Sequence, residues 1–404
     1  MLVQFRFRNY GPFRDENVFD MRAIKAYKEH SYNLMDIGDG ESLLKTAAVL
    51  GANARGKSSF IDAYRTFSQI VILSANNSPE EGESVLKANY NPFLFSESEE
   101  DTEFEGVYVE GGMEYQYGFL YNSRQIRYEW LYMRNLETKR RSTILERREN
   151  SFKLGISVRK ECAPFHDQIE KDVLALSYFN RLKLKTDVFK MAFYCVNSML
   201  AISFTKEVYT ELMLNNFFRE CTIEEMQKRL LEFLDAVDIG IKGITIERNK
   251  EKVEVYTHHI GADGNEYKMP LNLESDGTRK MIAVYSYVTK ALELNKGLMV
   301  DELNTQLHPL LQKYVIDLFH ADGARGQLIY TTHDTTLLDR KYCRRDQVWF
   351  VDKKETGEAH LYSLAEFHVR NDVSYENGYL QGLYGAVPIL KDFKMEENNN
   401  CGNG

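Results

Sequence analysis

The chain has 404 residues, and its 51 Lys and Arg against 60 Asp and Glu give a formal net charge of −9. Hydrophobic residues make up 43% of the chain and charged residues 27%, as in soluble globular proteins, which excludes a disordered chain. The acidic balance argues against a surface that coats nucleic acid non-specifically, although it does not exclude a local basic groove. The sequence contains no run of about 18 apolar residues, so we expect no membrane-spanning helix. The 5 cysteines lie far apart without a CxxC pair, which fits a reducing cytoplasm, and we expect a cytoplasmic protein.

Residues 1–160 are expected to form the N-terminal part of a folded head. Apolar alternation predicts a strand at Leu2–Arg8, and a second strand is expected at Lys45–Leu50, before a glycine-rich loop. An apolar stripe predicts a helix over residues 61–75. Residues 104–133 are rich in Tyr, Phe and Val with period-2 alternation, which predicts an antiparallel β subdomain.

The remainder of the chain divides into three predicted parts. Residues 161–237 contain no glycine and predict a helical insertion, whereas residues 391–404 are polar and predict a disordered tail. Residues 238–390 alternate strands with helices, which predicts a sheet with helices on both faces that completes the head. The elements expected there are strands at 241–248, 252–259, Gly297–Asp301, Gln327–Thr331 and Gln347–Asp352, and helices at Asp276–Leu294 and His308–His320. The fold class is therefore α/β, with a mixed sheet.

The first chemical motif is GANARGKSS, which matches the phosphate-loop pattern G-x-x-x-x-G-K-[ST]. Gly51 and Gly56 let backbone N–H groups approach phosphate oxygens, and the following helix start faces the anion. Lys57 is expected to supply a mobile charge for the β- and γ-phosphates, and Ser58 a hydroxyl for Mg²⁺. The motif predicts bound ATP and Mg²⁺. The expected nucleotide contacts are Gly51, Ala52, Asn53, Ala54, Arg55, Gly56, Lys57, Ser58 and Ser59.

Two further motifs end predicted strands with acidic or imidazole side chains. In GLMVDELNTQLHP the strand ends in two acids: Asp301 is expected to hold Mg²⁺ directly or through water, and Glu302 to polarise the attacking water. QLIYTTHD places His333 just beyond the carboxyl end of another strand, where ligands of such sheets bind. We interpret Glu302 and His333 as the catalytic candidates.

The fourth motif, LNLESDGTRKM, places Ser275 and Gly277 at the start of a predicted helix. A serine at this position caps the helix, and the helix N-terminus favours an anion. Alone, the pattern indicates no more than a good N-cap.

In chain order (phosphate loop, S-x-G before a helix, the DE pair, and the strand ending in TTHD), the four motifs resemble the head of ABC-type ATPases, with Walker A and Walker B motifs, and specifically the SMC- and RecF-like branch. In that branch the S-x-G signature of one head caps the ATP bound by another. The resemblance implies a homo-oligomer, at least a dimer, with ATP at a shared interface that includes Ser275 and Gly277. The signature here reads ESDGT rather than LSGGQ, and the glutamine of the usual lid has only Asn91 or Gln116 as candidates.

A narrower resemblance covers about 1–135 and 240–390. The segments GANARGKSS, ESDGTRKM, DELNTQLHP, THDTTLLD, RRDQVWFV and YLQGLYGAVP are similar to bacterial abortive-infection ATPases of the RloA/AbiL type, relatives of the AriA subunit of PARIS. In the last segment Leu383 stands where a basic residue is expected. The resemblance implies an anti-phage sensor or switch that controls a separate effector, of a Toprim- or RloB-like kind.

Two other functions remain as alternatives. One is a RecF-like DNA-repair ATPase that clamps DNA, and the other is a scaffold in which ATP turnover is incidental. A basic cluster at 139–148 fits either a solvated hairpin or a contact with nucleic acid or an acidic partner. The pair His258-His259 has no flanking set of metal ligands, so we expect it at a strand end. No membrane partner is expected.

Overall fold

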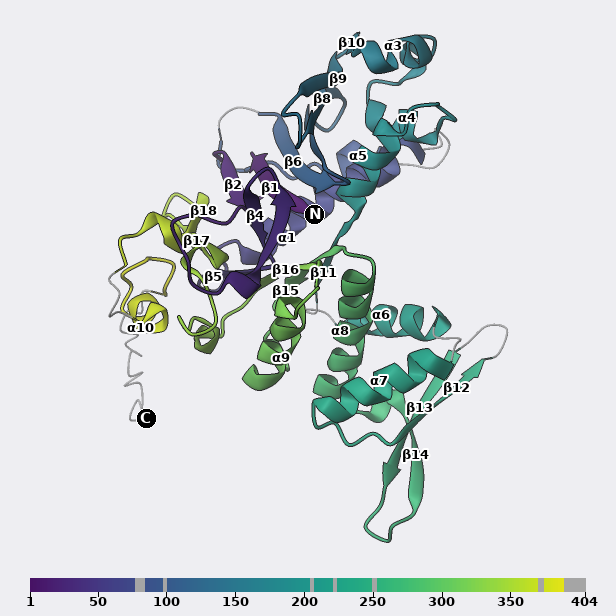
Figure 1. The fold of residues 1–404 in the computed structure, drawn as a ribbon, viewed down its shortest axis with the longest axis vertical. Coiled ribbons are helices and arrows are strands. Elements are labelled where there is room, and N and C mark those ends of the chain that lie inside the picture. The colour runs from purple at the N-terminus through teal and green to yellow at the C-terminus, as the bar shows by residue number, and fades with distance from the viewer. Residues whose placement is uncertain are drawn as a thin grey trace, which may run out of the picture.

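The structure is a computed structural model that describes residues 1–76, 84–96, 100–203, 207–220, 224–248, 253–369 and 374–388. The predicted tail 391–404 lies outside the described residues. Figure 1 shows three regions: a lobe with a large antiparallel sheet, a central sheet, and a lobe of helices with a small sheet.

The central sheet has six strands in the order β11-β15-β16-β5-β17-β18. All neighbours in it pair in parallel except β17 and β18, which are antiparallel, so the sheet is mixed. The strands are β5 (Thr46–Leu50), β11 (Met199–Ser203), β15 (Gly297–Asp301), β16 (Gln327–Thr331), β17 (Val348–Lys353) and β18 (Ala359–Ser363).

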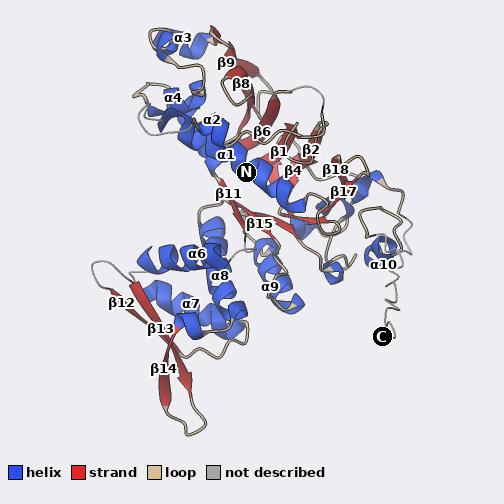
Figure 2. Cartoon of the chain, turned by 180° about the vertical axis from the view of Figure 1, so that it is seen from behind, coloured by secondary structure: helices blue, strands red, loops and turns tan. Residues whose placement is uncertain are grey.

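Helices cover both faces of the central sheet, as the cartoon in Figure 2 shows. Because side chains alternate along a strand, β5 feeds two cores. Ala47 and Val49 pack in the core that contains α1 (Lys57–Leu73). Ala48 and Leu50 pack in the second core, with α8 (Asp276–Glu293) and α9 (Pro309–His320). The predicted α/β class with helices on both faces is confirmed.

A seven-stranded antiparallel sheet confirms the β subdomain; its order is β10-β9-β8-β7-β6-β1-β2. Gly111 and Gly112 make the turn between β6 and β7 with φ of 56° and 74°, a left-handed backbone that glycine adopts without strain. Its strands are β1 (Leu2–Arg8), β2 (Asn17–Asp20), β6 (Thr102–Glu110), β7 (Met113–Tyr121), β8 (Ile126–Asn135), β9 (Arg141–Arg148) and β10 (Ser151–Leu154). Nearby elements are β3 (Leu34–Gly38), β4 (Glu41–Leu44), α2 (Val85–Ala88), α3 (Ile156–Cys162), α4 (Ala175–Arg181) and α5 (Val188–Asn197).

The segment 161–237 differs from the expectation of a purely helical insertion. It contains β11, which pairs with β15 over Met199–Ser203 and is an edge strand of the central sheet. A five-residue apolar run such as MLAIS cannot be told from a piece of buried helix by periodicity, and only pairing with a distant strand decides between them. The division of the chain into domains stays a prediction.

The third region combines α8 with α6 (Glu207–Glu220), α7 (Glu224–Ala236) and a small antiparallel sheet. That sheet has the order β12 (Gly243–Arg248), β13 (Val253–Ile260) and β14 (Glu266–Pro270). Its hairpin projects away from the central sheet (Figure 1). The remaining helix is α10 (Tyr375–Leu380), and the short 3-10 turns are Ser31–Asn33, Ser74–Asn76, His166–Gln168, Leu271–Leu273, Thr335–Leu337, Arg345–Gln347 and Leu364–Glu366.

Candidate functional site

The phosphate-loop motif forms the turn between β5 and α1. Strand β5 ends at Leu50, and the helix begins at Lys57, inside the motif and earlier than predicted. A Cβ on Gly51 would stand 2.4 Å from the carbonyl oxygen of Val351, so no side chain fits there. Gly56 has φ of 116°, a backbone conformation that other residues rarely adopt. Both glycines are therefore required by the local geometry.

Lys57 is buried, with only 4% of its side chain exposed. Its Nζ donates to the carbonyl oxygens of Gly51 at 2.9 Å and Ala52 at 3.3 Å, and lies 3.0 Å from Nε2 of His333. Glu302 Oε1 lies 4.0 Å from the same Nζ. Burial lowers the pKa of Lys57, while the carboxylates of Glu302 and Asp301 act in the opposite direction. The ammonium is thus folded back on its own loop, within reach of two other candidates.

Glu302 and His333 meet at the ends of two neighbouring strands. Glu302 Oε1 and His333 Nε2 are 3.0 Å apart. Burial acts to raise the pKa of Glu302, but the hydrogen bond and charge of His333 and the charge of Lys57 outweigh it, and the pKa is lowered. The carboxylate is therefore in its basic form at neutral pH. His333 also donates its backbone N–H to Oδ1 of Asn304 at 3.3 Å, a contact that the motifs did not predict.

A cavity of about 310 Å³ brings most of these side chains together. It joins three segments that are far apart in the sequence: the phosphate loop, the end of β15 and the end of β16. It continues past the loop to the turn after β1 and the end of β17. Its lining residues are Pro12, Asn53, Ala54, Gly56, Lys57, Ser58, Ser59, Glu302, His333 and Lys353.

Asp301 lies behind this cavity rather than in its lining. It is 3% exposed, and its two carboxylate oxygens accept hydrogen bonds from Thr331 Oγ1 at 2.8 Å and Ser203 Oγ at 3.3 Å. Sequence reasoning missed both hydroxyls. Ser203 could have been found only by recognising that β11 runs parallel to β15, in a register that sets it opposite Asp301.

Two loop residues have contacts outside the cavity. Arg55 forms an ion pair with Asp352 at 3.2 Å and donates to the carbonyl of Lys353, which ties the loop to β17. The N–H of Ala52 donates to the carbonyl of Ala386 at 2.9 Å, so the C-terminal segment YLQGLYGAVP also supports the loop. Leu383 of that segment is 57% exposed.

Ser275 and Gly277 are not brought into the cavity. Ser275 is the N-cap of α8, and its Oγ accepts the N–H of Thr278 at 3.2 Å, as the pattern predicted. The serine is exposed. A Cβ on Gly277 would lie 3.0 Å from the carbonyl oxygen of Gln306, in the loop that follows Glu302. The start of α8 thus reaches the site only through that loop.

Neither lid candidate lines the cavity. Asn91 accepts the N–H of Gly11 at 2.7 Å through its carbonyl, near the side chain of Ser59. Gln116 lies on β7 and donates to Glu105 at 2.9 Å.

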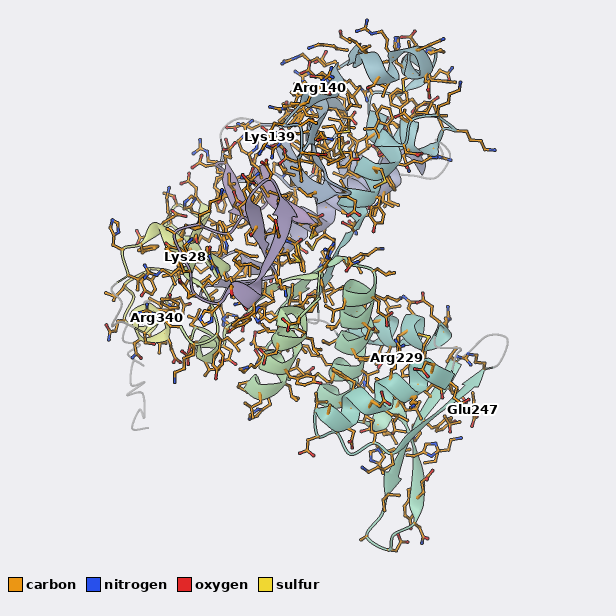
Figure 3. All side chains as sticks on the ribbon, in the orientation of Figure 1. Lys28, Lys139, Arg140, Arg229, Glu247 and Arg340 are labelled. Atoms are coloured by element: carbon orange, nitrogen blue, oxygen red, sulfur yellow. The ribbon has the colours of Figure 1, made fainter. Side chains whose placement is uncertain are left out.

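The basic cluster at 139–148 has two kinds of members. Arg147 is fully buried beside Glu129, so it is not part of a solvated hairpin. Lys139 and Arg140 lie at the turn between β8 and β9, where Figure 3 labels them. His258 and His259 lie on β13, where His259 contacts Glu274 at 2.6 Å and His258 contacts Thr245 at 2.7 Å.

One protein-family model matches part of the chain. Residues 213–339 match the model of a family described as "AAA domain, putative AbiEii toxin, Type IV TA system". The match includes Asp301, Glu302 and His333, but covers less than a third of the chain and leaves out the phosphate loop. It agrees with an ATPase-like domain at these positions. No curated protein matches the chain.

Among solved structures, the chain is similar to the SMC head domain from Thermotoga maritima. The two share 12% sequence identity with a TM-score of 0.42, over 90% of this chain and 98% of that chain. Among the helices of the described residues, none is long and apolar enough to cross a membrane.

Proposed function

We propose that the protein is an ABC-type ATPase that binds and hydrolyses Mg-ATP. The observation that carries the proposal is the single cavity in which the phosphate loop, Glu302 and His333 meet. Lys57 already binds oxygen atoms of its own loop, and phosphate oxygens can replace these carbonyls as its acceptors. Glu302, a carboxylate beside His333, is placed to orient and polarise a water at the terminal phosphate.

The residues near the loop also fit a magnesium ion. Mg²⁺ prefers oxygen ligands and keeps several waters. Ser58 lines the cavity, while both oxygens of Asp301 already accept hydroxyl hydrogen bonds, which favours contact through water. When bound, the ion would neutralise phosphate charge. We expect the nucleoside to extend from the loop along Pro12 and Lys353, which also line the cavity.

The test is ATP binding and phosphate release by purified variants. Lys57→Ala should abolish binding, and Glu302→Gln should keep binding but lower turnover by about 100-fold or more, because an amide cannot act as a base. Lys190→Ala, an exposed lysine of α5, is the matched control and should behave as wild type. Normal turnover in Glu302→Gln would reject the role of Glu302.

We further propose that the ATP site is shared between chains in a dimer or larger homo-oligomer. Ser275 and Gly277 lie outside the cavity of their own head, and the exposed start of α8 is free to approach another. Mixing Lys57→Ala chains with Ser275→Arg chains should partly restore ATPase activity, since one hybrid site is intact on both sides. Absence of rescue, with mixed oligomers verified, argues against sharing.

The biological role that we infer is that of a cytoplasmic sensor or switch in an anti-phage abortive-infection system. The motif resemblance and the toxin-antitoxin description of the matched family support it. A separate effector, Toprim- or RloB-like, would supply the toxic chemistry, and ATP can control it only if the two states of the switch bind it differently. Phage plating should show protection from this gene with its genomic neighbour and not from either gene alone.

The same plating assay separates the alternatives. Lys57→Ala should remove protection by the pair while the protein stays soluble. Full protection by this chain alone would reject the two-component model. Tight, salt-sensitive DNA binding by the isolated protein would favour the DNA-clamping alternative instead.

A further inference from the structure

Lys280, on the second turn of α8, is a lysine with 0% exposure. Its ammonium donates to three backbone carbonyls of the loop after Asp301: those of Glu302 at 3.0 Å, Leu303 at 3.3 Å and Thr305. Burial lowers the pKa of Lys280 to about 7, against the carboxylates of Glu302 and Asp301, which raise it. Burying a charge in this way is costly unless its hydrogen bonds are made. All three of these bonds go to one loop.

That loop has a strained backbone at two positions. Glu302 has φ of 56° and Gln306 has φ of 60°, a left-handed conformation that costs energy for residues other than glycine. The N–H of Glu302 donates to Thr331 Oγ1 at 2.7 Å, and its carbonyl accepts from Lys280. The strained residue is therefore held from both sides. Because the backbone sets the direction of a side chain, this hold aims the Glu302 carboxylate at His333.

The other end of the loop contacts the first turn of α8. Gln306 Nε2 donates to Asp276 Oδ2 at 3.1 Å, and its carbonyl packs against Gly277, where a Cβ would be 3.0 Å away. The loop is thus attached to α8 at the first turn through Gln306 and at the second turn through Lys280. These contacts connect the start of α8 to the loop that carries Glu302.

We propose that Lys280 is a positioning residue that fixes the Glu302 backbone to α8 and so couples the helix start at Ser275 to the catalytic carboxylate of the same head. The inference rests on the proposed function, in which Ser275 and Gly277 contact ATP held by another chain. In this arrangement, Ser275 of one head contacts the ATP bound to the phosphate loop of its partner. That contact orders Glu302 of the first head, which acts on the ATP bound in the first head. Any positive coupling between the two ATP sites then depends on Lys280.

The experiment measures ATP affinity and the dependence of ATPase rate on ATP concentration for full-length variants. Wild type should give a Hill coefficient above 1. Lys280→Met, which keeps chain length without the donors, should lower kcat by about 10- to 100-fold with ATP affinity unchanged, and its Hill coefficient should fall to about 1. Lys290→Met, at the exposed far end of α8, is the matched control and should match wild type.

Gln306→Ala is a second variant. Because Gln306 is exposed, this substitution leaves no cavity in the core. It should lower the Hill coefficient with a smaller loss of kcat, and it decides the question if Lys280→Met does not fold. Wild-type kcat and cooperativity in both variants, or a non-cooperative wild type, would overturn the coupling alone. Failure of wild type to bind ATP would instead overturn the proposed function.

Discussion

Two clusters of buried charge in this molecule have similar members and different surroundings. In the β lobe, Glu129 and Arg147 are both 0% exposed and 3.8 Å apart. Beyond the strand ends of the central sheet, Lys57 and Glu302 are 4.0 Å apart, with 4% and 16% of their side chains exposed. His333, which joins the second cluster, is 34% exposed. The first cluster is closed to solvent, and the second opens onto a cavity.

The closed cluster has its hydrogen bonds filled by the protein. Glu129 accepts from Tyr117 and from the N–H groups of Ala175 and Leu176, which begin α4. Arg147 donates to the backbone carbonyls of Glu149, Val173 and Glu170. The open cluster contains an ammonium that rests on its own loop and a carboxylate that faces space for a ligand. A charged cluster whose hydrogen bonds are all made within the protein indicates a structural role. A cluster whose charged groups face a cavity and can still bind a ligand indicates a catalytic or binding role.

The largest effect that we predict on stability is at Arg147. Arg147→Met should lower the free energy of unfolding by about 3–5 kcal/mol, since it leaves the Glu129 carboxylate buried without its partner. Urea unfolding measures this loss. Arg148→Met, an exposed neighbour on the same strand, is the control and should change stability little.

A double variant sharpens the comparison. Glu129→Gln with Arg147→Met removes both charges and leaves an amide to accept the N–H groups of α4. It should regain part of the stability lost in Arg147→Met, because no unpaired charge remains. If Arg147→Met is as stable as wild type, the pair is not the structural anchor that its burial implies.

The partly buried histidine His320 tests by pH how burial acts on an ionisable group. His320, at the end of α9, places Nε2 2.8 Å from Thr46 Oγ1, and burial lowers its pKa to about 4. Between the ordinary pKa near 6.5 and about 4, the unfolded chain binds a proton that the folded chain does not. Stability should therefore fall as pH falls through this window, by at most about 3 kcal/mol. Thermal melts across the window should show a weaker dependence in His320→Gln.

The open cluster of Lys57, Glu302 and His333 could be predicted from the sequence, whereas the closed pair of Glu129 and Arg147 could not. The reason is physical. Phosphate binding requires glycines, a lysine and a hydroxyl at fixed spacing, so Gly51, Lys57 and Ser58 are recognisable in the sequence. Glu129 and Arg147 meet across two strands and a distant helix start, and no local spacing encodes that contact. Ser203 was missed likewise, because its role depends on the pairing of β11 with β15.

The next prediction concerns Ser203, which is buried like the closed cluster but lies beside the open one. It is 7% exposed and donates to Asp301, which we propose faces the magnesium ion. Ser203→Ala should weaken Mg²⁺ binding in the presence of ATP by about 10-fold, as is typical for groups that orient a ligand of a metal. Titration of ATPase activity with Mg²⁺ measures it. Ser177→Ala removes another buried hydroxyl, bonded to Val71, and should leave the titration unchanged. An unaltered Mg²⁺ dependence in Ser203→Ala would make Ser203 only a packing residue.

The smallest change in stability that we predict is that of Glu302→Gln, and it contrasts most clearly with Arg147→Met. Glu302→Gln removes a charge from the open cluster, but the remaining Lys57 still donates to the carbonyls of Gly51 and Ala52, and the site borders a cavity that water can enter. The free energy of unfolding should therefore stay within about 1 kcal/mol of wild type, as for partly exposed ion pairs, although ATP turnover is lost. Urea unfolding without nucleotide measures the first quantity, and phosphate release the second. A loss of stability near that of Arg147→Met would mean that Glu302 is a structural partner of Lys57, and the distinction between the two clusters would fail.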